Sequence, residues 1–323
     1  MYMPNKWYQN LPALLVAALL TACGGGGGGD SSAPPVFNPP VTNPPATSCV
    51  VSPAGLPGAT GDTAIDGFNW FNYRRSQIGL SMLTCNEMIN KAAAGHSNYL
   101  RLNNTVTHDQ VSGNPGFTGV TTQNRLANAG YALTGQYAYG EVISAAASND
   151  GFYHAEELIA AIYHRFVIFE PRFREMGTGT ATGNGYTYFT ADMAASGTLA
   201  PGLGVGKIVS YPKDGQVSVP TSFDSDTESP DPVPNLNRVG YPVSVHADID
   251  STGITVTSFT INPRGGAQMT TRLLSSATDQ HTSKQAAAII PLSTLAPNTT
   301  YDVSFAGKVD GVSVTKNWSF TTK

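Results

Sequence analysis

Four short pieces of residues 65–193 decide how this chain is interpreted: Thr-His-Asp at 107–109, Tyr-Gly-Glu at 139–141, Tyr-His-Arg at 163–165 and Tyr-Thr-Tyr-Phe-Thr at 186–190. They carry two imidazoles, a carboxylate and aromatic hydroxyls, at separations that no single helix face can explain. If the fold brings them together, they form a polar cleft able to bind a metal ion or a small ligand. The rest of the chain then forms an anchor, a stalk and a second module.

The first 22 residues have the pattern of an export signal. Lys6 precedes an apolar run over residues 11–20, which is shorter than the roughly 20 residues that span a bilayer. The run ends in Leu-Thr-Ala-Cys at 20–23, similar to the lipobox of bacterial lipoproteins, in which the cysteine is lipidated. We predict a signal peptide over 1–22 and a lipid anchor at Cys23, and a plain signal peptide with an incidental cysteine is the alternative. Gly24 is typical of sorting to the outer membrane, so we expect a periplasmic or surface-exposed protein of the bacterial cell envelope.

Residues 23–60 have the composition of a tether. Six glycines follow Cys23, and proline pairs occur at 34–35, 39–40 and 44–45; such a segment favours an extended chain and cannot build a core. With Cys23 lipidated, Cys49 and Cys85 remain. An oxidising compartment favours a disulfide between them, and two free buried thiols are the alternative.

Charge limits the partners of the protein. The formal net charge is −4, which excludes a basic nucleic-acid-binding surface and a polybasic segment for anionic lipids. We therefore expect the membrane, through the lipid at Cys23, and an envelope or extracellular ligand as partners, and no nucleic acid.

Residues 61–196 have helical periodicity interleaved with a few strands. Helices are predicted over 65–80, 84–102, 123–128 and 155–169, and strands over 137–145, 176–181 and 186–194. Asp62 or Thr63 can cap the first helix, Thr84 the second, Gly130 can end the third, and Pro171 can end the fourth, with His164 near its C-terminal end. His96 faces inward on the second helix, where it either bonds to a backbone carbonyl or forms an edge of the cleft.

Residues 206–323 differ in composition from the residues before them. Seven short runs with strand composition, separated by turn residues, predict a β-sandwich. The turn at 295–301, Leu-Ala-Pro-Asn-Thr-Thr-Tyr, resembles the tyrosine corner of fibronectin type III-like domains.

The first module resembles the CAP superfamily, which includes cysteine-rich secretory proteins, antigen 5 and plant pathogenesis-related proteins, and within it the bacterial secreted branch. The resemblance rests on the order and spacing of several motifs. These are FNYRR at 71–75 with IGL at 78–80, AGHS at 94–97, TH at 107–108, Arg125 with AGY at 129–131, YGEVI at 139–143, HR at 164–165 and GTG at 177–179. It implies an α/β chain: an α-β-α sandwich with a central cleft, followed here by an all-β Ig/fibronectin-like sandwich.

The resemblance also implies site residues. His108 matches the first cleft histidine of the family, Glu141 matches the acid of its Gly-Glu-Asn motif, and His164-Arg165 match a pair that faces the cleft in bacterial members. The asparagine of that motif is Val142 here. In the last strand, Tyr188 replaces a histidine and Ala191 a glutamine.

The expected cleft thus contains His108, Glu141, His164, Tyr188, His96 and Arg165. His108, His164 and Glu141 could bind Zn²⁺ or Mg²⁺ with water in an open position, or Glu141 could act as a general base. The third interpretation is a hydrogen-bonded structural cluster.

Other polar residues have simpler alternatives. Arg165 could be a surface charge at a helix C-terminus, Arg125 a partner of an acid or a helix cap, and Asp109 and Asp192 supports for neighbouring imidazoles. The functional hypotheses are binding of a metal or small polar ligand, metal-assisted hydrolysis of a peptidase-like kind, and a non-catalytic surface adhesin.

Overall fold

A four-stranded sheet with strand order β1-β3-β4-β2 lies at the centre of the first region of the computed structural model, which describes residues 48–323. Its strands are β1 (Thr84–Cys85), β2 (Ala138–Ala146), β3 (Glu175–Gly183) and β4 (Tyr186–Ala195). β3 and β4 form the predicted antiparallel hairpin, β2 pairs antiparallel with β4, and β1 pairs parallel with β3. The signal peptide, Cys23 and most of the tether lie outside the described residues.

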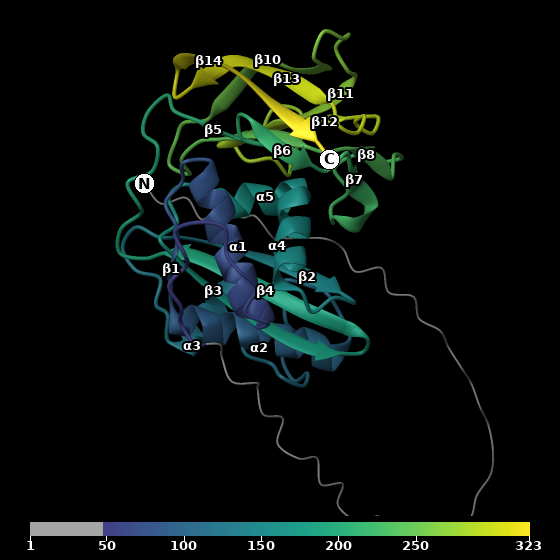
Figure 1. Ribbon diagram of the computed structural model, residues 1–323. Coiled ribbons are helices and arrows are strands. Elements are labelled where there is room, and N and C mark those ends of the chain that lie inside the picture. The colour runs from purple at the N-terminus through teal and green to yellow at the C-terminus, as the bar shows by residue number, and fades with distance from the viewer. Residues whose placement is uncertain (1–47) are drawn as a thin grey trace, which may run out of the picture. The chain divides into compact units, whose positions relative to one another are not determined.

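Helices cover both faces of this sheet (Figure 1). They are α1 (Thr63–Gln77), α2 (Glu87–Asn103), α3 (Thr122–Ala129), α4 (Gly151–Ala160) and α5 (Ile162–Ile168). Alternate residues of β4 divide between two cores: Phe189 packs with side chains of α1 and α4, and Ala194 packs with side chains of α2 and α3. The predicted α-β-α layering follows from this alternation.

Local capping explains most helix boundaries. The carboxylate of Asp62 accepts hydrogen bonds from Ala64 N and Ile65 N at the start of α1, as predicted, and Gly130, with a φ of 106°, ends α3. The prediction that Thr84 caps the second helix is wrong, because Thr84 lies in β1 and the side chain of Asn86 caps α2 instead.

The single helix predicted over 155–169 is wrong. The chain leaves the helical conformation at Ala161, whose ψ is 119°, and α5 begins at Ile162. The carboxylate of Glu228, from the second region, accepts hydrogen bonds from the backbone N–H groups of Ile162, Tyr163 and His164. These N–H groups have no partner within a helix that begins there, so a distant residue supplies the cap. His164 consequently lies in the first turn of α5 and not near a C-terminal end.

The second region is all β. One sheet has the strand order β10-β13-β14-β6, another has the order β11-β12-β9-β5, and β7 pairs with β8. The bounds are β5 (Val209–Tyr211), β6 (Gln216–Val219), β7 (Ser222–Asp224), β8 (Arg238–Gly240), β9 (Val243–His246), β10 (Ile254–Pro263), β11 (Thr271–Leu274), β12 (Ala286–Pro291), β13 (Thr300–Val309) and β14 (Val312–Thr322). In the turn before β13, the hydroxyl of Tyr301 accepts a hydrogen bond of 2.7 Å from Ala296 N.

Arg165 joins the two regions. Its guanidinium donates to the carbonyl oxygens of Ile159 and Pro242, each at 2.6 Å, and lies 4.9 Å from the ring centre of Tyr211 and 5.0 Å from that of Tyr241. The side chain is fully buried. A buried arginine of this kind needs hydrogen-bond acceptors and aromatic faces around it. Both predictions for Arg165, a cleft residue and a surface charge, are therefore wrong.

The disulfide between Cys49 and Cys85 is confirmed, with a Cα–Cα distance of 5.4 Å. It fixes the first described residues to the strand β1. Among residues 48–323, no helix combines the length and the apolar character that crossing a membrane requires.

We predict that Gly179→Ala strongly destabilises the protein. A Cβ at this position in β3 would lie 2.1 Å from Ala94 N, in the backbone of α2, so the helix would have to move away from the sheet. Overpacking of this kind typically costs about 1–3 kcal/mol, and we expect a loss at the upper end in chemical denaturation.

The matched control is Gly58→Ala, since no heavy atom lies within 4 Å of a Cβ built at Gly58. Equal stability of the two variants would contradict direct packing of α2 on β3.

Candidate functional site

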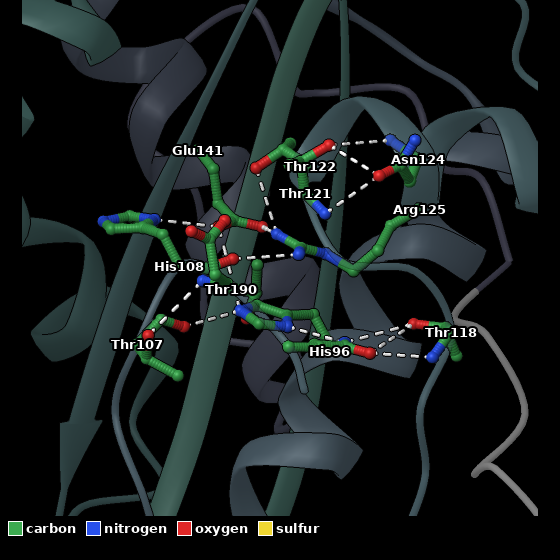
Figure 2. A network of polar contacts seen from close by, with 12 residues as sticks. His96, Thr107, His108, Thr118, Thr121, Thr122, Asn124, Arg125, Glu141 and Thr190 are labelled. Carbon is green, nitrogen blue, oxygen red and sulfur yellow. Dashed lines mark hydrogen bonds and ion pairs between the residues drawn. The ribbon is translucent and has the colours of Figure 1, made fainter. Parts of the chain in front are cut away.

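His108, Glu141 and Arg125 form the centre of a polar network on the α2/α3 face of the sheet. His108 Nδ1 donates to Glu141 Oε1 at 2.8 Å, and Arg125 Nη2 donates to Glu141 Oε2 at 2.5 Å. Figure 2 shows Glu141 between the other two side chains, with the His108 ring at the edge of the network. The side chain of His108 is 25% exposed, whereas those of Glu141 and Arg125 are almost completely buried. The histidine is therefore the group of this trio that solvent can reach.

Arg125 holds the loop that carries His108. From α3, its Nη1 donates to the carbonyl oxygens of His108 at 2.9 Å and Val120 at 3.3 Å, while Nη2 also donates to Thr122 Oγ1. One guanidinium thus bonds to two distant points of the loop over 104–121 and to the acid on β2. The prediction that Arg125 pairs with an acid is confirmed.

His96 supports the network from α2 and has no exposed surface. Its Nε2 donates to the carbonyl oxygen of Thr107 at 2.9 Å, its Nδ1 accepts from Gln110 Nε2 at 2.8 Å, and its Nε2 lies 3.8 Å from Glu141 Oε1. Burial lowers the pKa of His96 to about 4, so the ring is neutral near pH 7. The interpretation of His96 as a core histidine bonded to a carbonyl is confirmed, and it also borders the network.

Glu141 is ionised. Burial disfavours its charged form, but the Arg125 guanidinium, together with the hydrogen bond from His108, outweighs burial and holds the pKa of this carboxyl well below its usual value. A carboxylate with such a low pKa is a fixed negative charge that orients its neighbours.

Asp192 lies directly across from Glu141, on β4. Burial and the adjacent Glu141 carboxylate raise the pKa of Asp192 well above its usual value. Neither of its oxygens has a hydrogen-bond donor among residues 48–323. A protonated Asp192 avoids two charges side by side and can donate its own proton to Glu141.

His164 lies outside this network. Its Nδ1 donates to Glu228 Oε1 at 3.0 Å, in the same arrangement that caps α5, and Arg165 is buried against the second region. The prediction that this pair faces the cleft is wrong for a physical reason. Residues of the β region, which the motif does not include, supply the acceptors that draw both side chains to the junction.

Tyr188 and Val142 project to opposite faces of the sheet. Tyr188 packs with Tyr99 and donates its hydroxyl hydrogen to Asn104 Oδ1 at 3.2 Å. Val142 belongs to the apolar core on the opposite face of the sheet. Asp109, predicted as a possible support for an imidazole, is exposed.

The three predicted metal ligands are not assembled. His108 and Glu141 are in contact, but His164 is bonded to Glu228, and the described part of the chain contains no group of three His, Cys, Asp or Glu side chains arranged to hold a metal ion. Both oxygens of Glu141 already accept strong hydrogen bonds, and the Arg125 charge beside them opposes a cation. These residues are therefore better suited to orienting the His108 imidazole than to binding a metal ion.

Two parts of the network were not predicted from the sequence. Gln110 bonds to His96 and, through its Oε1, accepts from Thr118 N at 2.7 Å, which closes the loop on itself. Asp192 was assigned only as a support for an imidazole, whereas it lies beside the carboxylate. Cross-strand register decides this contact, and the register cannot be read from the separate motifs.

Residues 68–193 match the model of the CAP family, described as the cysteine-rich secretory protein family. Two solved structures are similar over part of the chain. One is an extracellular protein containing an SCP domain from Bacillus anthracis, with 22% identity and a TM-score of 0.35, over 41% of this chain and 39% of that protein. The other is an outer surface protein from Borrelia burgdorferi, with 13% identity and a TM-score of 0.34, over 40% of this chain and 89% of that one. No curated protein matches the sequence.

We predict opposite effects for the two neighbouring acids. Glu141→Gln leaves the buried Arg125 without a counter-charge, which costs about 3 kcal/mol or more. Asp192→Asn preserves the shape of a neutral carboxyl. A group with a raised folded-state pKa contributes stability that is lost as pH rises. The free energy of unfolding of Asp192→Asn should therefore increase relative to that of the wild type from about pH 4 upward.

Urea denaturation of both variants between pH 4 and pH 8 measures these differences. A stability difference between Asp192→Asn and the wild type that does not change with pH would show that Asp192 is not protonated in the folded protein.

Proposed function

Because residues 68–193 carry a CAP domain, we propose that the chain is an exported envelope protein that binds a small polar ligand at His108. One observation carries the proposal: the partly exposed His108 ring is held in a fixed orientation by the buried, ionised Glu141. A hydrogen-bonding group that needs no reorganisation binds a ligand at lower entropic cost. Burial of Arg125, Glu141 and Asp192 around it preserves the orientation.

The contacts of Glu141 support the alternative functions, hydrolysis and metal binding, less well. A hydrolase in which Glu141 acts as the general base needs a carboxylate with a pKa near the working pH, and Arg125 keeps that pKa well below its usual value. Binding of Zn²⁺ or Mg²⁺ at His108 and Glu141 would require Glu141 to exchange one of its two hydrogen bonds for a metal bond. A non-catalytic adhesin would need no ligand at this position.

Thermal unfolding of the full chain separates these functions. The panel contains amino acids, dicarboxylic acids, monosaccharides, inorganic phosphate, ZnCl₂ and MgCl₂. A compound present at 100 times its Kd stabilises the folded state by about 2.7 kcal/mol and should raise the Tm by about 5 °C. The shift should disappear in His108→Ala and persist in His281→Ala, a histidine on the exposed surface.

Each result has one meaning in this test. A Tm increase with a metal salt and with no other compound would indicate that the site binds a metal ion rather than a small polar ligand. No shift with any compound, or a shift that His108→Ala retains, would contradict binding at His108 and favour the adhesin.

The all-β region would serve as a rigid spacer or docking module for the CAP domain. We take it to be an Ig/fibronectin type III-like sandwich, supported by its two four-stranded sheets and by the bond between Tyr301 and Ala296 N. Glu228 and Arg165 fix it to the first region through buried hydrogen bonds, so the orientation of the two regions would be preserved in the cell.

We further propose that Cys23 is lipidated and anchors the protein in the envelope, by the pattern at residues 20–23. Cys23→Ser should then move the protein from the membrane fraction to the soluble fraction and abolish incorporation of labelled fatty acid. Cys49→Ser with Cys85→Ser is the matched control and should retain the label. Labelling of the Cys23→Ser protein would contradict the anchor.

A further inference from the structure

The exposed face of the sheet β10-β13-β14-β6 contains a hollow with a volume of 360 Å³. Its rim and walls include Asn262, Arg264, Asp302, Ser304, Asn317 and Ser319. Ligand sites usually have volumes of about 300–1,000 Å³, so this hollow can receive a small molecule or a short segment of a polymer. It belongs to the all-β region and shares no residue with the His108 network.

Strand register arranges these side chains as a grid. Asn262 on β10 pairs with Asp302 on β13, and Asp302 pairs with Ser319 on β14; in the next row, Ser304 pairs with Asn317. Paired residues on neighbouring strands project to the same face, with the strands about 5 Å apart. The hollow therefore presents a plane of hydrogen-bonding groups about 5 Å apart across the strands.

Several of these side chains form no hydrogen bond within residues 48–323. The side chains of Ser304, Asn317 and Ser319 make no hydrogen bond to any other residue among 48–323. The amide of Asn262 donates to the carbonyl of the next residue, which leaves its carbonyl oxygen available to a ligand. Amides and hydroxyls both donate and accept, so they can bond to a ligand rich in hydroxyl groups.

Charge restricts the class of ligand. Arg264 is paired with Asp302 at 2.7 Å, and Asp214 adds an uncompensated carboxylate to the wall. The hollow therefore has a local charge of about −1 and disfavours anions. Nε and Nη2 of Arg264 already donate to the carboxylate of Asp302. Nη1 of Arg264 and the remaining lone pairs of the carboxylate are the groups of this pair left to bond to hydroxyls of a sugar ring.

We propose that this hollow binds a neutral oligosaccharide, with Asn317 and Ser304 as its central hydrogen-bonding residues. A sugar ring offers hydroxyl groups around its rim that each donate and accept, which matches a flat grid of amides, hydroxyls and one ion pair. The β region then carries a glycan-binding face in addition to its contacts with the first region.

Isothermal titration of the full chain with chitotetraose, cellotetraose and maltotetraose tests the proposal. At least one of the three should bind with a Kd of about 1 mM or lower, a modest affinity for an open polar site. Asn317→Ala should weaken binding about tenfold and Ser304→Ala about threefold to fivefold, because each removes a hydrogen bond. Asn317→Asp, which keeps the side-chain shape and adds charge, should also weaken binding and guards against an effect of lost side-chain volume.

Thr315→Ala is the matched control. Thr315 lies two residues from Asn317 on β14, and so on the same face, but outside the hollow. This variant should bind as the wild type does.

Three results would overturn the proposal. The first is no heat of binding with any of the three sugars at a sugar concentration tenfold above ~1 mM. The second is equal affinity for the sugar in Asn317→Ala and the wild type. The third is binding of CaCl₂ or inorganic phosphate that competes with the sugar. The first two would show that the grid is a solvated surface, and the third that the hollow is an ion site.

Discussion

The ion pair between Arg125 and Glu141 is the interaction on which the site depends. It joins α3 to β2, and through the carbonyl oxygens of His108 and Val120 it also determines the course of the loop between α2 and α3. That loop runs from residue 104 to residue 121 without a helix or a strand, a length that is uncommon in a structureless connection. Side-chain bonds replace the missing regular structure.

Burying two charges costs free energy unless each finds partners. Here the two oxygens of Glu141 accept from His108 and Arg125. Burial and the Glu141 carboxylate raise the pKa of the neighbouring Asp192 carboxyl, which favours its neutral form. The net result is one positive and one negative charge in contact, with neutral His96 beside them. A single group of this cluster, His108, reaches solvent in a set orientation, and the chemistry of the site follows from that arrangement.

A second buried ionic cluster has a purely architectural role. Glu228 caps α5 and holds His164, while Arg165 lies between aromatic rings and carbonyl oxygens of the β region. The apolar core continues through this junction, with Phe169 and Tyr211 in contact at 5.0 Å between ring centres. A histidine and an arginine at motif positions of the first module therefore serve to attach the second.

The sequence by itself determined the features that depend on neighbouring residues. Asp62 and Gly130 mark helix ends through local hydrogen bonds and backbone freedom, the 3.6-residue and two-residue periods predict the helices and hairpin, and Cys49 and Cys85 were the pair available for a disulfide. Tertiary structure alone decided the break at Ala161, the position of His164 and the pairing of Asp192 with Glu141. In each case, the deciding partner lies more than 40 residues away in the chain, and its contact depends on strand register or on the packing of a second region.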